Sequence, residues 1–179
     1  VKEAVANVKR TRGIDIDMDT IPIDDPKTYQ LYCEGRTTGT FQFESAGMQK
    51  YLRELQPSTF EDLIAMNALY RPGPMDSIPD YIDRRHNPSK IKYKSKLLEP
   101  ILKSTYGCIV YQEQVMQICV KVAGYSYGHA DIVRRAMSKK KADVMEKERQ
   151  NFVYGNAEEG VPGCIANGID ERTANKIYD

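Results

Sequence analysis

Residues 112–137 read QEQVMQICVKVAGYSYGHADIVRRAM, and this stretch decides the fold class. Its apolar residues recur at the spacing of one helix face, and Gly124 is a typical helix stop. Ser126 then favours the N-cap of a second helix with the same apolar period. The apolar positions of the two helices are Val115, Ile118, Cys119, Val122, Ala130, Val133 and Met137. The stretch therefore predicts two consecutive helices.

Helix signals also dominate the chain before this stretch. Asp25-Pro26 predicts a capped helix to about Cys33, and Ser45 predicts one that ends near Leu55, before Pro57. Ser58-Thr59-Phe60-Glu61 has the spacing of a capping box and predicts a helix over 60–70. That helix is apolar on almost all sides, so we expect it to be buried. Arg71-Pro72-Gly73-Pro74 should end it.

The remaining segments fit the same class. Helices are expected near 76–85, 97–103 and 142–154, and the only plausible extended segment is 106–111, which contains Ile109 and Val110. The fold is predicted to be mainly α, with at most one or two short strands.

Length and composition limit the number of domains and the class of protein. The 179 residues, 41% hydrophobic and 28% charged, suit one medium domain or two small ones. No apolar run approaches the ~20 residues of a membrane span. The start, Val1-Lys2-Glu3-Ala4, has no basic leader followed by an apolar stretch, and both ends of the chain fall within helical patterns. We therefore expect a piece of a larger protein, with no membrane partner.

Charge is segregated although the formal net charge is only +1. Residues 13–34 hold six acidic side chains and one basic one, whereas 84–103 hold seven basic and one acidic. Residues 134–149 hold seven basic and three acidic side chains. Such separation favours a surface that faces a polyanion.

No complete catalytic or metal site is predicted. The four cysteines lack zinc-finger spacing, and neither His86 nor His129 has a ligand partner at a suitable distance along the chain. Reduced, mostly buried thiols of a cytosolic protein are the favoured interpretation. The aspartates of 15–19 alternate without the glycine and distal glutamate of a calcium loop, so capping or solvated roles are favoured over metal binding.

The basic helix is more specific. Arg134 and Arg135 precede Ser138-Lys139-Lys140-Lys141 by one turn, and such a group suits oxygen-rich anions such as phosphates. However, Arg135 lies four residues after Asp131 and can simply pair with it, and lysines at a helix C-terminus favour the helix dipole. The residues alone leave phosphate binding and a solvated face equally open.

Several ordered motifs carry a family resemblance. They are Thr40-Phe41-Gln42-Phe43-Glu44-Ser45, Gly47-Met48, Phe60-Glu61-Asp62, Arg71-Pro72-Gly73-Pro74, Tyr106-Gly107, Tyr111-Gln112-Glu113-Gln114-Val115-Met116, Arg134-Arg135-Ala136-Met137 and Lys139-Lys140-Lys141. In order and spacing these resemble the alpha subunit of bacterial DNA polymerase III, a C-family polymerase, over essentially the whole chain. The Arg-Pro-Gly-Pro sequence resembles the broadly distributed branch rather than the Gram-positive paralogue with an inserted exonuclease.

The resemblance implies the fingers of this nucleotidyltransferase, with residues 1–35 a helical connection out of the palm and 36–179 the fingers domain. The fingers would bind the incoming deoxynucleoside triphosphate and help to position the template. The implied phosphate contacts are Arg134, Arg135, Lys139, Lys140 and Arg71, and Gln112 and Gln114 would lie near the nascent base pair or backbone. The sequence by itself also allows purely local roles. Both glutamines can cap a helix or form local hydrogen bonds, and Arg71 can close the helix that precedes it.

The resemblance also implies that the catalytic aspartates of the palm, which hold Mg²⁺ in the full-length enzyme, lie upstream of Val1. We therefore expect no catalytic residue, no bound cofactor and no polymerase activity in this chain by itself. The implied partners are primer–template DNA, deoxynucleoside triphosphates, the sliding clamp and the clamp loader, in the bacterial cytoplasm. A helical nucleic-acid-binding module without a nucleotide role, or a protein-interaction scaffold, remain alternative functions.

Overall fold

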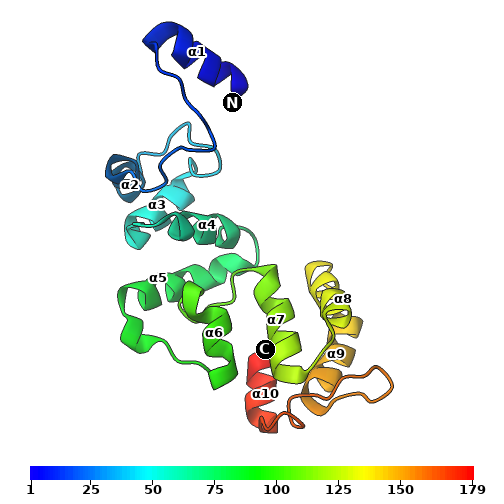
Figure 1. Ribbon diagram of the computed structural model, residues 1–179. Helices are drawn as coiled ribbons and strands as arrows, with labels where there is room; N and C mark the ends of the chain where they lie inside the picture. Colours follow the sequence, from blue (N-terminus) through cyan, green and yellow to red (C-terminus); the bar gives the residue numbers. More distant parts are fainter. The chain divides into compact units, whose positions relative to one another are not determined.

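The computed structural model describes residues 1–179 and is built from ten α-helices (Figure 1). No strand forms, and the only β-bridge joins Asn156 to Val161. The mainly α fold class is thereby confirmed. The chain divides into two compact units, Val1–Ile64 and Ala65–Asp179. This division does not test the predicted boundary between a helical connection (1–35) and the fingers domain (36–179), which stays a prediction.

The first unit contains three complete helices and the start of a fourth. They are α1 (Lys2–Arg12), α2 (Pro26–Cys33), α3 (Ala46–Leu55) and α4 (Phe60–Leu69), which continues into the second unit. Helices α2 and α3 pack together, and α3 buries Met48, Leu52 and Leu55. Asp25 and Ser45 accept backbone N–H groups at the starts of α2 and α3, so both predicted caps are confirmed.

Helix α4 is capped one residue later than predicted. The Asp62 carboxylate accepts the N–H groups of Ser58 and Thr59 at 2.9 and 3.2 Å, and Thr59 Oγ1 accepts the N–H of Asp62 at 3.3 Å. The reciprocal pair is therefore Thr59 and Asp62, because Thr59 immediately precedes the helix. The prediction that this helix is buried was also wrong for part of its surface, since Phe60 and Ile64 stay 44% and 42% exposed.

The second unit is a helical assembly (Figure 1), and it contains a large cluster of buried apolar side chains. Its α-helices are α5 (Ile78–His86), α6 (Glu99–Leu102), α7 (Gln112–Ala123), α8 (Tyr127–Ser138), α9 (Ala142–Tyr154) and α10 (Glu171–Tyr178). Short 3₁₀ turns lie at Pro74–Ser77, Pro88–Lys90, Lys96–Leu98 and Lys103–Thr105. Helix α7 packs on α8, α8 on α9 and α9 on α10, so helices that follow one another in the sequence are neighbours in space.

The turn between α7 and α8 requires its glycine. Gly124 has φ 77°, in the left-handed region, and a Cβ there would lie 2.8 Å from the Pro162 ring. The buried apolar cluster of this unit contains side chains from the turn Lys96–Leu98, from helices α6 to α10 and from the segment between α9 and α10. It includes Ile118, Val122, Ala130, Val133, Phe152, Val153, Val161, Ala174 and Ile177.

The predicted extended segment at 106–111 does not form a strand. Tyr106 and Gly107 have φ values of 53° and 77°, which turn the chain. The N–H groups of Val110 and Tyr111 both donate to the side chain of Gln114, at 2.8 and 2.9 Å, rather than to a partner strand. A local side-chain acceptor therefore replaces a sheet ladder.

Two other expectations from the sequence concern the cysteines and membrane-spanning helices. Cys108, Cys119 and Cys164 are buried free thiols and Cys33 is half-buried, as predicted. None of the helices combines the length and the apolar character needed to cross a membrane.

Candidate functional site

Helix α8 places the two predicted arginines outside its core face, with Arg134 at the flank beside α7 and Arg135 on the opposite side. Ser126 starts the helix by accepting the N–H of His129 at 3.2 Å. Ala130, Val133 and Ala136 are buried at the spacing of one face. This periodicity leaves Arg134 half-buried and Arg135 exposed, with side-chain exposures of 26% and 67%.

Asp131 holds both arginines. Its Oδ1 accepts Arg134 Nε at 2.8 Å and lies 2.7 Å from Arg134 NH2, and its Oδ2 lies 2.7 Å from Arg135 Nε. The hydrogen bond from Arg134 is the largest influence that lowers the pKa of this carboxyl below its usual value. One carboxylate thus orients two guanidinium groups on the same helix.

Gln112 extends the group to the neighbouring helix. Its Oε1 accepts Arg134 NH1 at 2.7 Å, and its Nε2 lies 3.5 Å from Ser138 Oγ. Arg134 is therefore hydrogen-bonded from two helices, whereas Arg135 uses only Nε and keeps its side chain in solvent. We call Gln112, Asp131, Arg134 and Arg135 the arginine pair site.

The lysine run continues this basic surface at the end of α8. The N–H of Lys141 donates to Ala136 O at 3.0 Å and that of Lys140 to Met137 O at 3.1 Å, which are the two bonds of a Schellman motif. Lys140 occupies the left-handed position of the motif, with φ 51°. Lys139, Lys140 and Lys141 are all exposed. The short turn therefore presents three ammonium groups beside the arginine pair site.

Gln114 has a different environment. Its side chain is buried, with Oε1 accepting the N–H groups of Val110 and Tyr111. Its Nε2 donates to Thr105 Oγ1 at 2.8 Å and to Ile101 O at 3.2 Å. The whole amide is used to hold the start of α7, where Gln112 lies. Gln114 can thus act on a ligand only by positioning its neighbour.

Arg71 makes local contacts. Its NH2 donates to Asn67 O at 3.3 Å, near the end of α4, and its backbone bonds reach Leu69 and Met75. None of these bonds joins it to the arginine pair site. The contact with Asn67 is the helix-closing interaction that the sequence left open.

The aspartates near the N-terminus also use local partners. Asp15 forms an ion pair with Lys9 at 2.6 Å, and Asp17 accepts the N–H of Asp19 at 3.0 Å. Neither belongs to a group of three or more potential metal ligands. These aspartates do not form the paired carboxylates that a two-metal site requires.

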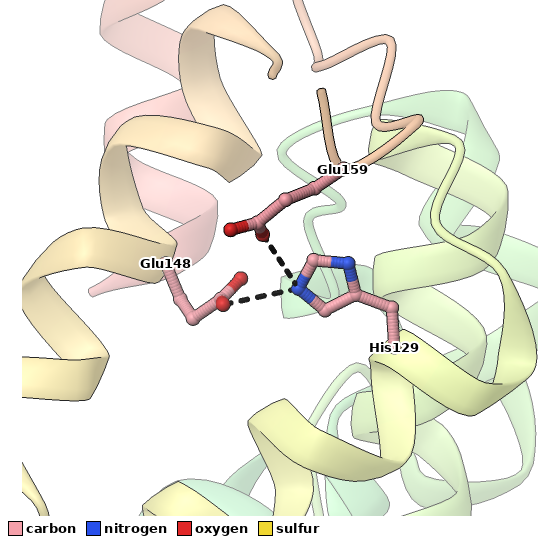
Figure 2. Close-up of side chains that lie close together, drawn as sticks. All are labelled: His129, Glu148 and Glu159. Atoms are coloured by element: carbon pink, nitrogen blue, oxygen red, sulfur yellow. Dashed lines mark hydrogen bonds and ion pairs between the residues drawn. The ribbon is translucent and has the colours of Figure 1, made fainter. Parts of the chain in front are cut away.

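A second polar group on α8 faces α9. His129 Nε2 lies 3.0 Å from Glu148 Oε1 and 3.5 Å from Glu159 Oε2 (Figure 2). Lys147 forms an ion pair with the other oxygen of Glu159 at 2.5 Å, and this contact is the largest influence that lowers the pKa of Glu159. The expectation that His129 has no partner was wrong, because packing of α8 on α9 brings together residues far apart in the sequence.

A family model of the bacterial DNA polymerase III alpha subunit finger domain matches residues 1–160, which include the arginine pair site and the lysine run. The chain belongs to this finger domain family. The finger domain identity agrees with the resemblance carried by the motifs at Arg71-Pro72-Gly73-Pro74 and Arg134-Arg135.

Curated relatives agree. The chain is 50% identical over all of its 179 residues to the DNA polymerase III subunit alpha of Staphylococcus aureus (strain MRSA252). It is 49% identical over the same length to the protein of the same name from Staphylococcus epidermidis (strain ATCC 12228 / FDA PCI 1200). In both cases the chain covers 16% of the relative's length.

Two features of this finger domain were missed from the sequence. The contact of Gln112 with Arg134 joins residues 22 positions apart, and that of His129 with Glu148 joins residues 19 apart. The amphipathic pattern of α8 and α9 was a usable signal that these helices pack together. It does not tell which polar residues meet at their boundary, because that depends on the rotation of each helix.

Proposed function

We propose that the chain is the part of a bacterial replicative DNA polymerase that binds the incoming deoxynucleoside triphosphate and helps to position template DNA. The observation that carries the proposal is the arginine pair site, where Asp131 orients Arg134 and Arg135 beside an exposed lysine run. Guanidinium groups that are already oriented bind phosphate oxygens with strong charge-assisted hydrogen bonds.

The two arginines have different roles in this proposal. Arg135, with most of its side chain in solvent, contacts the triphosphate directly. Arg134 contacts the same phosphates. Its hydrogen bonds to Asp131 and Gln112 also fix the geometry between α7 and α8. Lys139 and Lys140 add phosphate contacts from the turn, and Gln112 lies near the nascent base pair or backbone. Gln114 supports Gln112, and Arg71 is a more distant phosphate contact.

The chemistry of transfer belongs to other parts of the protein. We propose that the catalytic Mg²⁺ and the carboxylates that bind it lie outside these residues. Binding of the sliding clamp and the clamp loader would likewise use the rest of the subunit, in the bacterial cytoplasm. The contribution of this chain is positive charge placed where the leaving pyrophosphate gains negative charge.

Single-nucleotide incorporation by the full-length polymerase tests the proposal. Arg135→Ala should lower kcat/KM for the nucleotide by about 10- to 150-fold, because one charge-assisted phosphate contact contributes about 1.5–3 kcal/mol. Binding of primer–template DNA should change much less. Lys121→Ala removes a basic residue from the exposed side of α7 and serves as the matched control, with near-normal kinetics expected.

Two outcomes would contradict the proposal. Normal incorporation by both Arg134→Ala and Arg135→Ala would remove the triphosphate role. Weaker DNA binding with an unchanged nucleotide KM would instead favour a helical nucleic-acid-binding module that does not contact the nucleotide.

A further inference from the structure

Three potential metal ligands converge from separate elements of the second unit. His129 comes from the first turn of α8, Glu148 from α9, and Glu159 from the loop that follows α9 (Figure 2). One donor atom of each side chain lies within 4.8 Å of the other two. Figure 2 shows both carboxylates directed at the same imidazole nitrogen.

The spacing of these atoms suits a metal ion. Zinc–nitrogen and zinc–oxygen bonds of about 2.0–2.2 Å in a tetrahedral site place neighbouring ligand atoms about 3.3–3.6 Å apart. His129 Nε2 lies 3.0 Å from Glu148 Oε1 and 3.5 Å from Glu159 Oε2. Small rotations of two side chains are enough to reach tetrahedral geometry, and water would complete the fourth position.

Neighbouring groups hold the three ligands in place. The Tyr125 hydroxyl donates to Glu148 Oε2 at 2.9 Å, and Asn151 Nδ2 donates to Glu159 Oε2 at 3.1 Å. The Tyr125 ring lies 4.7 Å from the imidazole ring, centroid to centroid. Hydrogen bonds of this kind orient carboxylates in metal sites, and here they are made to both glutamates.

The charge balance also favours a cation. Glu148 has a side-chain exposure of only 4%, and its ion-pair partner is His129, whose side chain is 12% exposed. Lys147 compensates Glu159 on its outer oxygen but is not paired with Glu148. A buried carboxylate is strongly unfavourable without a compensating positive charge, and a bound cation at this site would supply one.

We propose that His129, Glu148 and Glu159 bind a divalent transition-metal ion, with zinc as the expected ion. One nitrogen and two carboxylate oxygens suit zinc, whereas Mg²⁺ and Ca²⁺ take oxygen ligands alone. The ion ties α8 to α9 and to the following loop, so its role is structural. The proposal concerns a different side of α8 from the arginine pair site and does not rest on the proposed function.

Titration of the chelator-stripped 179-residue chain with ZnCl₂, followed by calorimetry, tests the site. We expect one equivalent to bind, and Glu159→Gln and His129→Gln each to weaken binding by at least about tenfold. His86→Gln replaces the other histidine and Glu146→Gln replaces an exposed carboxylate of α9 paired with Arg149; both should bind zinc normally. Co²⁺ should give the intense visible absorption of a tetrahedral site, and excess Mg²⁺ should not displace zinc.

Glu159→Gln is the decisive variant, because Glu159 lies on a loop and its loss does not disturb the core. Far-UV circular dichroism of each variant shows that the helices are retained. The proposal is overturned if no saturable equivalent of zinc binds, or if both Glu159→Gln and His129→Gln bind zinc as the unchanged chain does. Either result would make the group a set of polar contacts between His129 and two glutamates, without a metal ion.

Discussion

Arg134 and Arg135 are adjacent in the sequence and share Asp131, yet they differ in how much of the fold depends on them. Arg134 joins α7 to α8 through Gln112, whereas Arg135 makes only an exposed pair within its own helix. A single carboxylate can therefore orient one arginine for structure and the other for a ligand. The phosphate-binding and ion-pair interpretations, which the sequence left equally open, are compatible with each other.

We expect replacement of the two arginines to lower the stability of the chain by different amounts. Arg134→Ala should lower the free energy of unfolding by about 1–2 kcal/mol, because a half-buried group loses hydrogen bonds from two helices. Arg135→Ala should lower it by only about 0.3–0.5 kcal/mol, the value of an exposed helix ion pair. Urea denaturation of the two variants measures the difference. Equal losses would contradict the division of roles.

Lys140 provides a second prediction at the residue scale. Its left-handed backbone, φ 51°, disfavours side chains with a Cβ by about 1–2 kcal/mol. Lys140→Gly should therefore raise the melting temperature, whereas Lys140→Ala should not. Both variants should weaken binding of the full-length enzyme to DNA at low salt, since both lose the phosphate contact that we propose for Lys140. A lower melting temperature for Lys140→Gly would show that the lysine side chain itself stabilises the turn.

At the scale of elements, the start of α7 depends on one buried amide. Gln114 satisfies two backbone N–H groups and bonds to Thr105 and Ile101, so its removal leaves several buried polar groups without partners. We expect Gln114→Ala to destabilise the chain by about 2–4 kcal/mol and Gln112→Ala, at an exposed position, by less than about 1 kcal/mol. Thermal or urea unfolding compares them. Similar values for both would contradict the positioning role of Gln114.

The helices were predictable to the extent that their signals are local. Asp25, Ser45 and Ser126 cap helices where the sequence predicts, because a capping bond spans only three residues. The segment at 106–111 was not predictable from β-propensity, since Gln114 takes the backbone donors that a strand would have used. The His129 group depends on how two helices are rotated against each other, which no local pattern specifies.

At the scale of the whole molecule, activity should require residues beyond this chain. We expect the purified chain with Mg²⁺ to show no primer extension above a matched blank, because we propose that the carboxylates that bind the catalytic Mg²⁺ belong to other parts of the subunit. Full-length polymerase assayed in parallel is the positive control. Extension by the chain alone would contradict the proposed division of labour between this finger domain and the rest of the subunit.

Thiol reactivity should report on global unfolding. Burial raises the pKa of Cys119 and Cys164 to about 12, so almost no thiolate is present at neutral pH. In native buffer we expect a disulfide reagent to modify the half-buried Cys33 first and to leave Cys119 and Cys164 unmodified. In denaturant all four cysteines should react. Rapid native modification of Cys119 would show that the core opens without unfolding.

The sequential packing of α7, α8, α9 and α10 has a consequence for how the chain acquires its structure. Each contact between these helices closes only a short loop, so little chain entropy is lost before the contact stabilises the pair. Proteins dominated by such local contacts fold in microseconds to milliseconds. During synthesis, at about 5–20 residues per second, each helix would find its neighbour as it leaves the ribosome. The core can thus assemble by successive addition, without waiting for distant parts of a long polypeptide.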